Sequence, residues 1–432
     1  MSGTIKPRIF IGPMEIAGIA SGLSEGFSQL GIPASEVLGY PHPFGYSKTT
    51  PKGIVKLWQW VGGQLLQSGG KKTPRGLFCF VLHELLAWPV LLVSVFQFNT
   101  FIFLFAHTIT RTTLELWLLK RLGKKVIFVY AGSEARPPYI NGGIFPASVD
   151  PDLAFAAKRA RKTKKLIKRH ERYADFIINS PSTGQFHEIP FINWFAMGIP
   201  KTPPDIEEDV QRPEGDHVRI VHSPSHPVLK GSALIEACIE RMRKKGHKID
   251  FVRLEGVPNQ QVLATLASCD FVIDQLYSDT PMAVFATEAA FLGRPSVVGG
   301  YFSRDVAEVL EEGDIPPSCF VSPEGLDAAV ERLITDVDYR HKLGAEAKAF
   351  VFQKWNSRAV CEQYLRLIRG DVPDNWWFDP QQIRYTSGCG MPEEHAAVVV
   401  RLLVERYGLA ALQLDDKPAL RDAFIAMAED QG

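Results

Sequence analysis

One stretch in the second half of the chain combines residue types that could bind a phosphorylated sugar. In residues 270–300, Asp279 or Thr280 can cap a helix, and Pro281 suits its first turn, where no amide proton is required. The start of a helix presents free amide protons and the positive end of the helix dipole, which favours a phosphate group. Glu288 lies two turns into this helix, where its carboxylate could accept hydrogen bonds from a sugar diol.

The helix belongs to a predicted strand–helix–strand unit. Residues 271–273 form a short apolar run with strand character, Gly293 can end the helix, and Pro295 opens a second apolar run over residues 296–298. On these residues alone, the favoured interpretation is an ordinary structural unit with Glu288 in solvent.

The motifs of this segment resemble those of a known family. Ile273-Asp274-Gln275 precedes the loop, and Glu288-Ala289 with Leu292-Gly293-Arg294-Pro295 follows it. The segment is similar to the donor-binding core of GT-B glycosyltransferases of the retaining family 4 type. The resemblance implies that Glu288 holds the ribose of a nucleotide-sugar donor.

A second match lies upstream of this segment. A strand over residues 218–221 is followed by His222-Ser223-Pro224-Ser225 and then by Lys230-Gly231-Ser232 at the head of a helix. The resemblance implies that Lys230 contacts the donor diphosphate, because a fixed cation stabilises the charge that develops on a leaving nucleoside diphosphate. We assign Ser223 to the same donor site.

The resemblance further implies that the helix start at Thr280, Pro281 and Met282 contributes amide protons to diphosphate binding. With a cation and a helix dipole supplying positive charge, we expect no metal ion and no cofactor beyond the nucleotide-sugar substrate. The catalytic candidates are therefore Lys230 and Glu288, together with one histidine considered next.

Residues 131–136 resemble a family segment in which a histidine reaches the reacting sugar. Here Ala131 occupies that position. The nearest alternatives are His107, which follows a predicted strand, and His222. We take His107 as the candidate, although a lone histidine is more often a packed and hydrogen-bonded side chain.

The amino-terminal segment is a predicted strand over residues 8–13 that runs into a helix containing Gly18 and Gly22. Glycine lets a ligand or another backbone approach closely. The resemblance implies that the turn at Gly18 faces the cleft between two domains and touches both donor and acceptor.

Residues 85–105 contain no charged residue over 21 positions, which is long enough to cross a bilayer. Pro89, Gln97 and Asn99 interrupt this run. A helix over residues 77–95 followed by a buried strand over residues 100–105 is favoured over a membrane span, since buried parallel strands are also continuously apolar.

The number and distribution of charged residues indicate which kinds of partner the protein could bind. The 432 residues carry 48 basic and 48 acidic side chains, so the whole molecule has no general attraction to nucleic acid. Residues 158–172 hold nine Lys or Arg and one Glu. A solvated helix face is the default interpretation, and peripheral contact with an anionic membrane is the functional one.

The six cysteines show no paired spacing, which is typical of a reducing compartment. The start of the chain shows no signal-peptide apolar block, so a cytoplasmic location is expected, and the basic residues 158–172 give a position peripheral to the inner face of the membrane as the functional alternative.

The alternating pattern predicts an α/β protein with parallel sheets, and the resemblance implies a GT-B fold with two facing Rossmann-like domains and a cleft between them. We expect an amino-terminal acceptor-side domain over residues 1–205 and a donor-nucleotide domain over residues 216–370. A proline-rich and acidic linker, residues 198–215, joins them. A helical tail over residues 371–432 is expected to pack back on the first domain.

The resemblance implies a glycosyltransferase that moves a sugar from a nucleotide-sugar to a glycan or glycolipid acceptor with retention, in surface polysaccharide or glycoconjugate biosynthesis. Two alternatives stay open. One is a catalytically inactive GT-B-like binding protein, because Ala131 and Thr280 depart from the family pattern. The other is a non-hydrolysing sugar-nucleotide epimerase.

Overall fold

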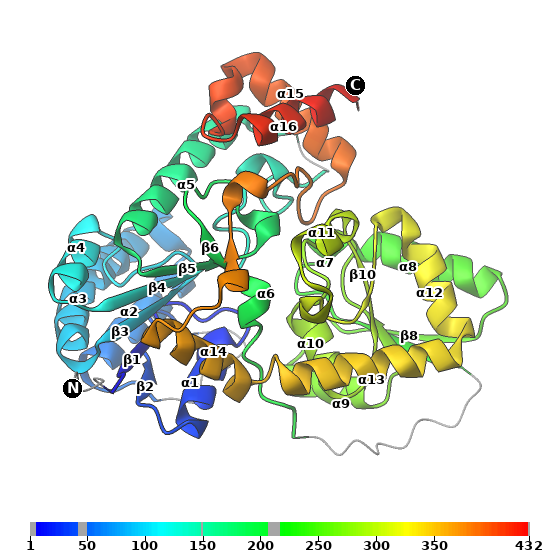
Figure 1. The fold of residues 1–432 in the computed structure, drawn as a ribbon, viewed down its shortest axis with the longest axis horizontal. Helices are drawn as coiled ribbons and strands as arrows, with labels where there is room; N and C mark the ends of the chain where they lie inside the picture. The colour runs from blue at the N-terminus through cyan, green and yellow to red at the C-terminus, as the bar shows by residue number, and fades with distance from the viewer. Residues whose placement is uncertain (1–5, 42–49, 148–149, 206–216, 431–432) are drawn as a thin grey trace.

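The computed structural model describes residues 6–41, 50–147, 150–205 and 217–430. They form two parallel β-sheets flanked by helices, in two halves that lie side by side, with the end of the chain over the first half (Figure 1). Part of the predicted linker, residues 206–215, lies outside the described residues.

The first sheet has the strand order β12-β6-β5-β4-β3-β1-β2, and all its pairs are parallel except that of β12 with β6. Its strands are β1 (Ile9–Gly12), β2 (Ala34–Glu36), β3 (Thr100–Leu104), β4 (Lys125–Val129), β5 (Phe176–Asn179), β6 (Phe191–Asn193) and β12 (Trp377–Phe378).

The second sheet is wholly parallel and has the order β11-β10-β9-β7-β8. Its strands are β7 (Val218–His222), β8 (Ile249–Arg253), β9 (Phe271–Ile273), β10 (Ser296–Gly299) and β11 (Cys319–Val321). The helices of this half are α7 (Pro227–Lys230), α8 (Ser232–Lys244), α9 (Asn259–Ala267), α10 (Val284–Phe291), α11 (Val306–Val309), α12 (Leu326–Thr335) and α13 (Val337–Gln353).

Alternate residues of the first sheet point to opposite sides and pack against different helices. Phe10 and Phe101 belong to the core that includes residues of α3, α4 and α5, whereas Ile9 and Ile102 belong to the core that includes residues of α1 and α14. The helices of this half are α1 (Ile19–Gln29), α2 (Gly53–Gln67), α3 (Pro74–Gln97), α4 (Thr113–Arg121), α5 (Leu153–Tyr173), α6 (Trp194–Met197) and α14 (Ser357–Arg369).

The predicted helix and strand over residues 77–105 are confirmed as α3 and β3. Among the described residues, α3 is the one helix long and apolar enough to cross a bilayer. Its inner side, which includes Ala87, Val90 and Leu91, nevertheless packs in the core of the first half.

The chain crosses between the halves twice at neighbouring positions. Lys201 and Asn356 form an isolated parallel bridge, and the Ser357 amide donates to the Lys201 carbonyl. After this second crossing, α14 packs against α1 rather than on the second sheet. The chain therefore returns to the first half before residue 370, the boundary expected from the sequence.

The tail beyond α14 contacts both halves. Strand β12 extends the first sheet, and the Tyr139 hydroxyl donates to the Leu412 carbonyl. On the other side, the Gly390 amide donates to the Tyr277 carbonyl, and Arg304 pairs with Glu393 at 2.9 Å. The tail helices are α15 (Glu393–Tyr407) and α16 (Pro418–Asp430).

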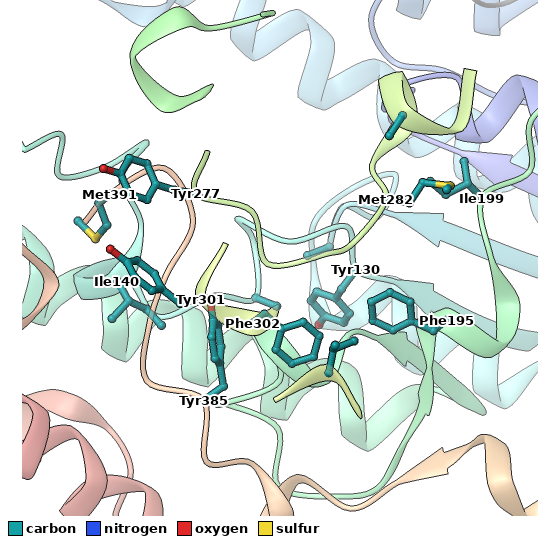
Figure 2. Close-up of a cluster of buried hydrophobic side chains, with 14 of the residues drawn as sticks. Tyr130, Ile140, Phe195, Ile199, Tyr277, Met282, Tyr301, Phe302, Tyr385 and Met391 are labelled. Carbon is teal, nitrogen blue, oxygen red and sulfur yellow. The ribbon is translucent and has the colours of Figure 1, made fainter. Parts of the chain in front are cut away.

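A buried apolar cluster joins the halves and the tail (Figure 2). Phe195 of α6 stacks on Phe302 with ring centroids 6.5 Å apart, and Phe302 meets Tyr385 of the tail edge-on at 5.3 Å. The halves are thus held together by packing as well as by the chain crossings. The labelled members of the cluster are Tyr130, Ile140, Phe195, Ile199, Tyr277, Met282, Tyr301, Phe302, Tyr385 and Met391.

Candidate active site

A cavity of about 380 Å³ lies at the carboxyl end of strand β7. Ligands in open parallel sheets bind at the carboxyl ends of the strands, where the loops and the helix starts meet. The second half supplies nearly all of the lining, and the turn before α1 adds Ala17. The lining residues are Ala17, Ser223, Pro224, Ser225, Lys230, Leu254, Gly256, Val257, Asn259, Val262, Ala283, Val284, Phe285 and Glu288.

Three of the predicted donor-site residues therefore meet in one cavity. Ser223 follows β7, Lys230 ends α7, and Glu288 lies in α10, and each of them lines the same space. The sequence separates these residues by up to 65 positions, from 223 to 288. The fold brings them together because β7 and β9 are neighbours in the second sheet.

Lys230 is positioned by a buried carboxylate. Its Nζ lies 3.1 Å from Oδ1 of Asp274, which follows β9 and is 1% exposed. The other carboxylate oxygen, Oδ2, is buried without a hydrogen-bond partner in the described structure. Asp274 thus fixes the ammonium group at the cavity wall, where it can meet an anion.

His222 has a structural role beside Lys230. One ring nitrogen lies 2.8 Å from the Ile273 carbonyl, and the other lies 2.8 Å from the Ser232 hydroxyl. Burial lowers the pKa of His222 below its usual value, although the bond to Ile273 opposes the shift. A neutral imidazole therefore ties β7 to β9 and to α8.

Glu288 is held in the cavity wall by two partners. Its Oε1 lies 2.6 Å from Nζ of Lys201 and accepts a hydrogen bond of 3.1 Å from Nδ2 of Asn259. The side chain is 3% exposed, so these contacts fix its orientation. Neither Lys201 nor Asn259 was predicted from the sequence, because Lys201 lies in a proline-rich segment and Asn259 reads only as the start of a helix.

The predicted helix start at Thr280, Pro281 and Met282 is wrong. Helix α10 begins at Val284, with Ala283 as its cap residue. Thr280 instead bonds the Met282 amide and carbonyl, at 3.4 and 3.2 Å, which closes a turn before the helix.

Met282 does not reach the cavity. Its side chain is fully buried and lies near Ile199 in the cluster between the halves (Figure 2). The Pro281 carbonyl accepts from Ser318 at 2.7 Å. The residues of the true helix start, Ala283, Val284 and Phe285, are the ones that line the cavity. The first amides of a helix have no partner within the helix, so this terminus can serve an anion beside Lys230.

The turn at Gly18 lies beside the donor cavity. The Glu15 carboxylate accepts from the amides of Gly18, Ala20 and Ser21 at 3.0, 3.3 and 3.0 Å, so these donors are already used within the protein. Gly18 lines a separate cavity of about 310 Å³. Its neighbour Ala17 is the residue of this turn that reaches the donor cavity.

His107 lies outside both of these cavities. Its Nδ1 is 2.6 Å from the Phe105 carbonyl, and burial lowers the pKa of the ring. The structure therefore does not bring His107 to Lys230 and Glu288.

The segment after β4 meets the loop after β9. Arg136 forms a buried ion pair with Asp279, so Asp279 is not available to cap a helix. Burial disfavours the charged guanidinium, but the Asp279 carboxylate outweighs this and raises the pKa of Arg136. Glu134 accepts a 2.5 Å hydrogen bond from the Ala131 amide, and burial raises its pKa to about 7.

Among the described residues, no group of three His, Cys, Asp or Glu side chains is arranged to hold a metal ion. The charged groups that line the donor cavity are Lys230 and Glu288. The cavity wall also contains apolar side chains, including Leu254, Val257 and Val262, which suit the face of a flat ring.

The fold defined by these two parallel sheets is the GT-B fold. The chain is similar to the catalytic domain of starch synthase IV from Arabidopsis thaliana bound to ADP and acarbose, with a TM-score of 0.51 and 11% identity over 85% of this chain and 99% of that one. It is also similar to HepE of Anabaena in complex with UDP and glucose, with a TM-score of 0.43 and 10% identity over 84% of this chain and 100% of HepE. No protein-family model matches the chain, and comparison with curated proteins gives no match.

Proposed function

We propose that this chain is a glycosyltransferase that binds a nucleotide-sugar in the cavity of the second half and transfers the sugar, with retention, to a glycan or glycolipid acceptor. The observation that carries this proposal is the meeting of Lys230, Glu288 and the start of α10 around one cavity of about 380 Å³. A volume of this size lies in the range of small-molecule sites.

In this proposal the donor diphosphate lies between the Lys230 ammonium and the first turn of α10. Negative charge grows on the diphosphate as the bond between the sugar and the diphosphate breaks. A cation held in advance by Asp274 and an oriented helix terminus stabilise that charge without rearrangement. The reaction then needs no resident metal ion.

Glu288 would accept hydrogen bonds from the ribose hydroxyls. Lys201 and Asn259 orient its carboxylate, so the binding geometry is set before the nucleotide arrives. The base would lie against Leu254 and Val257, which line the same cavity. Ala17, from the first half, closes the cavity on the side where the acceptor would approach.

The proposal extends to the acceptor and the pathway. The acceptor is a glycan or glycolipid, and the pathway is surface polysaccharide or glycoconjugate assembly at the cytoplasmic face of a membrane. Residues 158–172 of α5 support peripheral contact with anionic lipid. Lys164 and Lys168 of this helix pair with Glu188, whereas Lys158, Arg161 and Lys162 are exposed.

A binding protein without turnover is the second candidate. It is favoured by Ala131, which supplies no imidazole near the cleft, and by the Glu15 carboxylate, which occupies the amides of the first-half turn. An epimerase is the third candidate.

Incubating the purified chain with UDP-, GDP- and ADP-sugars distinguishes the three candidate functions. Slow release of free nucleotide that is lost in Lys230→Ala and reduced in Glu288→Ala supports the transferase. The control Lys244→Ala, an exposed lysine of α8, should behave as the wild type. Binding without turnover supports the second candidate, and interconversion of the sugar supports the third. Failure of every nucleotide to bind, in calorimetry with UDP, GDP and ADP, contradicts the proposal.

A further inference from the structure

The outer faces of α2 and α3 carry a continuous group of exposed apolar side chains. On α3, Phe78, Leu85 and Phe96 are 67%, 62% and 74% exposed, far more than is usual for such residues. We call this surface the α2–α3 face. Its members are Leu57, Trp60 and Leu66 of α2, with Leu77, Phe78, Val81, Leu85, Trp88, Leu92, Val93 and Phe96 of α3.

The exposed residues of α3 follow the helical repeat. Positions 78, 81, 85, 88, 92 and 96 are spaced by three or four, so they form one stripe along the helix. The opposite side of α3 is also apolar, because Ala87, Val90 and Val95 pack in the core of the first half. A helix that is apolar on all sides belongs in a protein interior or in contact with lipid.

Packing against the first half limits how α3 can meet lipid. A third of the most apolar window of the helix is buried, 33%, and its last residues lead into β3, which lies between β4 and β1 in the first sheet. The Lys124 ammonium further holds the carbonyls of Val95 and Phe98 at 2.6 and 2.8 Å. A helix anchored in this way can present one side to a membrane while the other side stays on the sheet.

The charges around the α2–α3 face have one dominant sign. Residues 50–97 contain five Lys or Arg, at positions 52, 56, 71, 72 and 75, and one acidic residue, Glu84. All five basic side chains are exposed, whereas Glu84 is half-buried and lies 3.8 Å from Arg111. Apolar side chains bordered by cations are complementary to an anionic bilayer surface, and Trp60 and Trp88 suit its interfacial layer.

The cationic helix α5 lies on the same side of the first sheet. Residues of α3, α4 and α5 share the core that includes Phe10 and Phe101, and Figure 1 shows the three helices along one side of that sheet. Between them, α4 adds exposed Leu114 and Trp117. Apolar and cationic surfaces thus occur together on the acceptor side of the molecule.

We propose that the α2–α3 face docks on an anionic lipid bilayer, with both helices parallel to the membrane plane and their apolar side chains in the interfacial layer. The inference is independent of sugar transfer, since it uses none of the cavity residues. It assigns the main apolar contact to α2 and α3 and leaves α5 to add electrostatic attraction.

Vesicle flotation of the full chain tests this proposal. The protein should float with vesicles that contain phosphatidylglycerol and far less with vesicles of pure phosphatidylcholine. The triple variant Phe78→Ser, Leu85→Ser, Leu92→Ser should lower the partition coefficient at least about tenfold. The control, Leu234→Ser, Val337→Ser, Leu409→Ser, replaces three exposed apolar residues elsewhere and should float as the wild type.

Two further experiments test the electrostatic attraction to the bilayer and the depth at which the α2–α3 face lies in it. Lys56→Glu with Lys72→Glu should weaken flotation several-fold, and 1 M salt should do the same for the wild type. Tryptophan fluorescence of the wild type should be quenched more by lipids brominated near the headgroup than by lipids brominated near the ends of the acyl chains. Trp60→Phe with Trp88→Phe should remove most of that quenching.

Three results would overturn the proposal. The first is equal flotation of the triple variant and the wild type. The second is a lipid-independent dimer that the triple variant converts to a monomer, which would make a second copy the occupant. The third is stronger quenching from the chain ends, which would place α3 across the bilayer. Each result leaves the nucleotide-binding tests unaffected.

Discussion

The guanidinium of Arg136 pairs with the carboxylate of Asp279, and this contact joins the loop after β4 to the loop after β9. Both residues are buried, at 5% and 9% exposure. The two sheets are therefore linked, near their carboxyl ends, by a charged contact that borders the apolar cluster between the halves.

Asp279→Ala should leave the Arg136 charge buried without its partner. Breaking a buried pair from one side lowers the free energy of unfolding by about 3–5 kcal/mol, which chemical denaturation can measure. Arg136→Met combined with Asp279→Ala should lose less, because no unpaired charge remains. The control Glu362→Ala removes an exposed pair with Arg358 and should cost no more than about 1 kcal/mol. If Asp279→Ala and Glu362→Ala lowered the free energy of unfolding equally, this account would be contradicted.

Glu134 should make stability depend on pH. Burial raises its folded-state pKa to about 7 from a usual value of 4.5, so its contribution is fully present below pH 4.5 and is lost as the pH rises through 7. Glu134→Gln does not ionise, and its stability relative to the wild type should rise between pH 5 and pH 8 by at most about 3 kcal/mol. Denaturation at both pH values measures this for the wild type and for Glu134→Gln. A difference that is the same at both pH values would rule out the raised pKa.

Gly26 should not tolerate a side chain. A Cβ atom there would lie 2.0 Å from the Ser357 carbonyl oxygen and 2.6 Å from Sγ of Cys361. Because the first contact is with backbone, Gly26→Ala should push α14 away from α1 and cost at least about 2 kcal/mol. At Gly313 the nearest atom is the flexible Nζ of Lys354 at 3.9 Å, so Gly313→Ala should change the melting temperature little. Equal melting temperatures for Gly26→Ala and Gly313→Ala would show that α14 can move away from α1 at no cost in stability.

Glu288 should determine the preference for a ribose. For the nucleoside diphosphate that binds best, the wild type should bind the ribonucleotide at least about tenfold more tightly than its 2′,3′-dideoxy analogue, because two hydrogen bonds to a charged acceptor are lost. Glu288→Ala should bind both alike, and Lys201→Met should reduce the preference by misorienting the carboxylate. Calorimetry with both nucleotides checks this. An unchanged preference in Glu288→Ala would assign the ribose to another residue.

The sequence predicted the strand and helix pattern well where local signals are strong. The apolar run that becomes β9, the interrupted apolar stretch that becomes α3 and β3, and the Lys230 motif all lie close to their expected positions. These features depend on residues near one another in the chain, and their periodicity and turn residues are visible directly.

The differences arise where polar side chains have partners that their residue types alone do not reveal. Asp279 and Thr280 have the residue types of a helix cap, but Asp279 is used by Arg136 and Thr280 closes its own turn. In the turn at Gly18, Ala17 lines the donor cavity, whereas Gly18 lines the separate cavity of the first half. The contact between Lys201 and Glu288 joins residues 87 positions apart, from 201 to 288, and no local pattern encodes it.

The tail fastens the two halves at a point away from the paired chain crossings (Figure 1). At the crossings, Lys201 and Asn356 lie side by side, and the Ser357 amide donates to the Lys201 carbonyl. At the tail, the ion pair of Arg304 with Glu393 is partly open to solvent, with Arg304 50% exposed. Ionic strength weakens such a pair much more than it weakens a buried one. Dissolved salt should therefore weaken the Arg304–Glu393 contact of the tail, whereas the buried apolar cluster and the buried Arg136–Asp279 pair continue to hold the halves together.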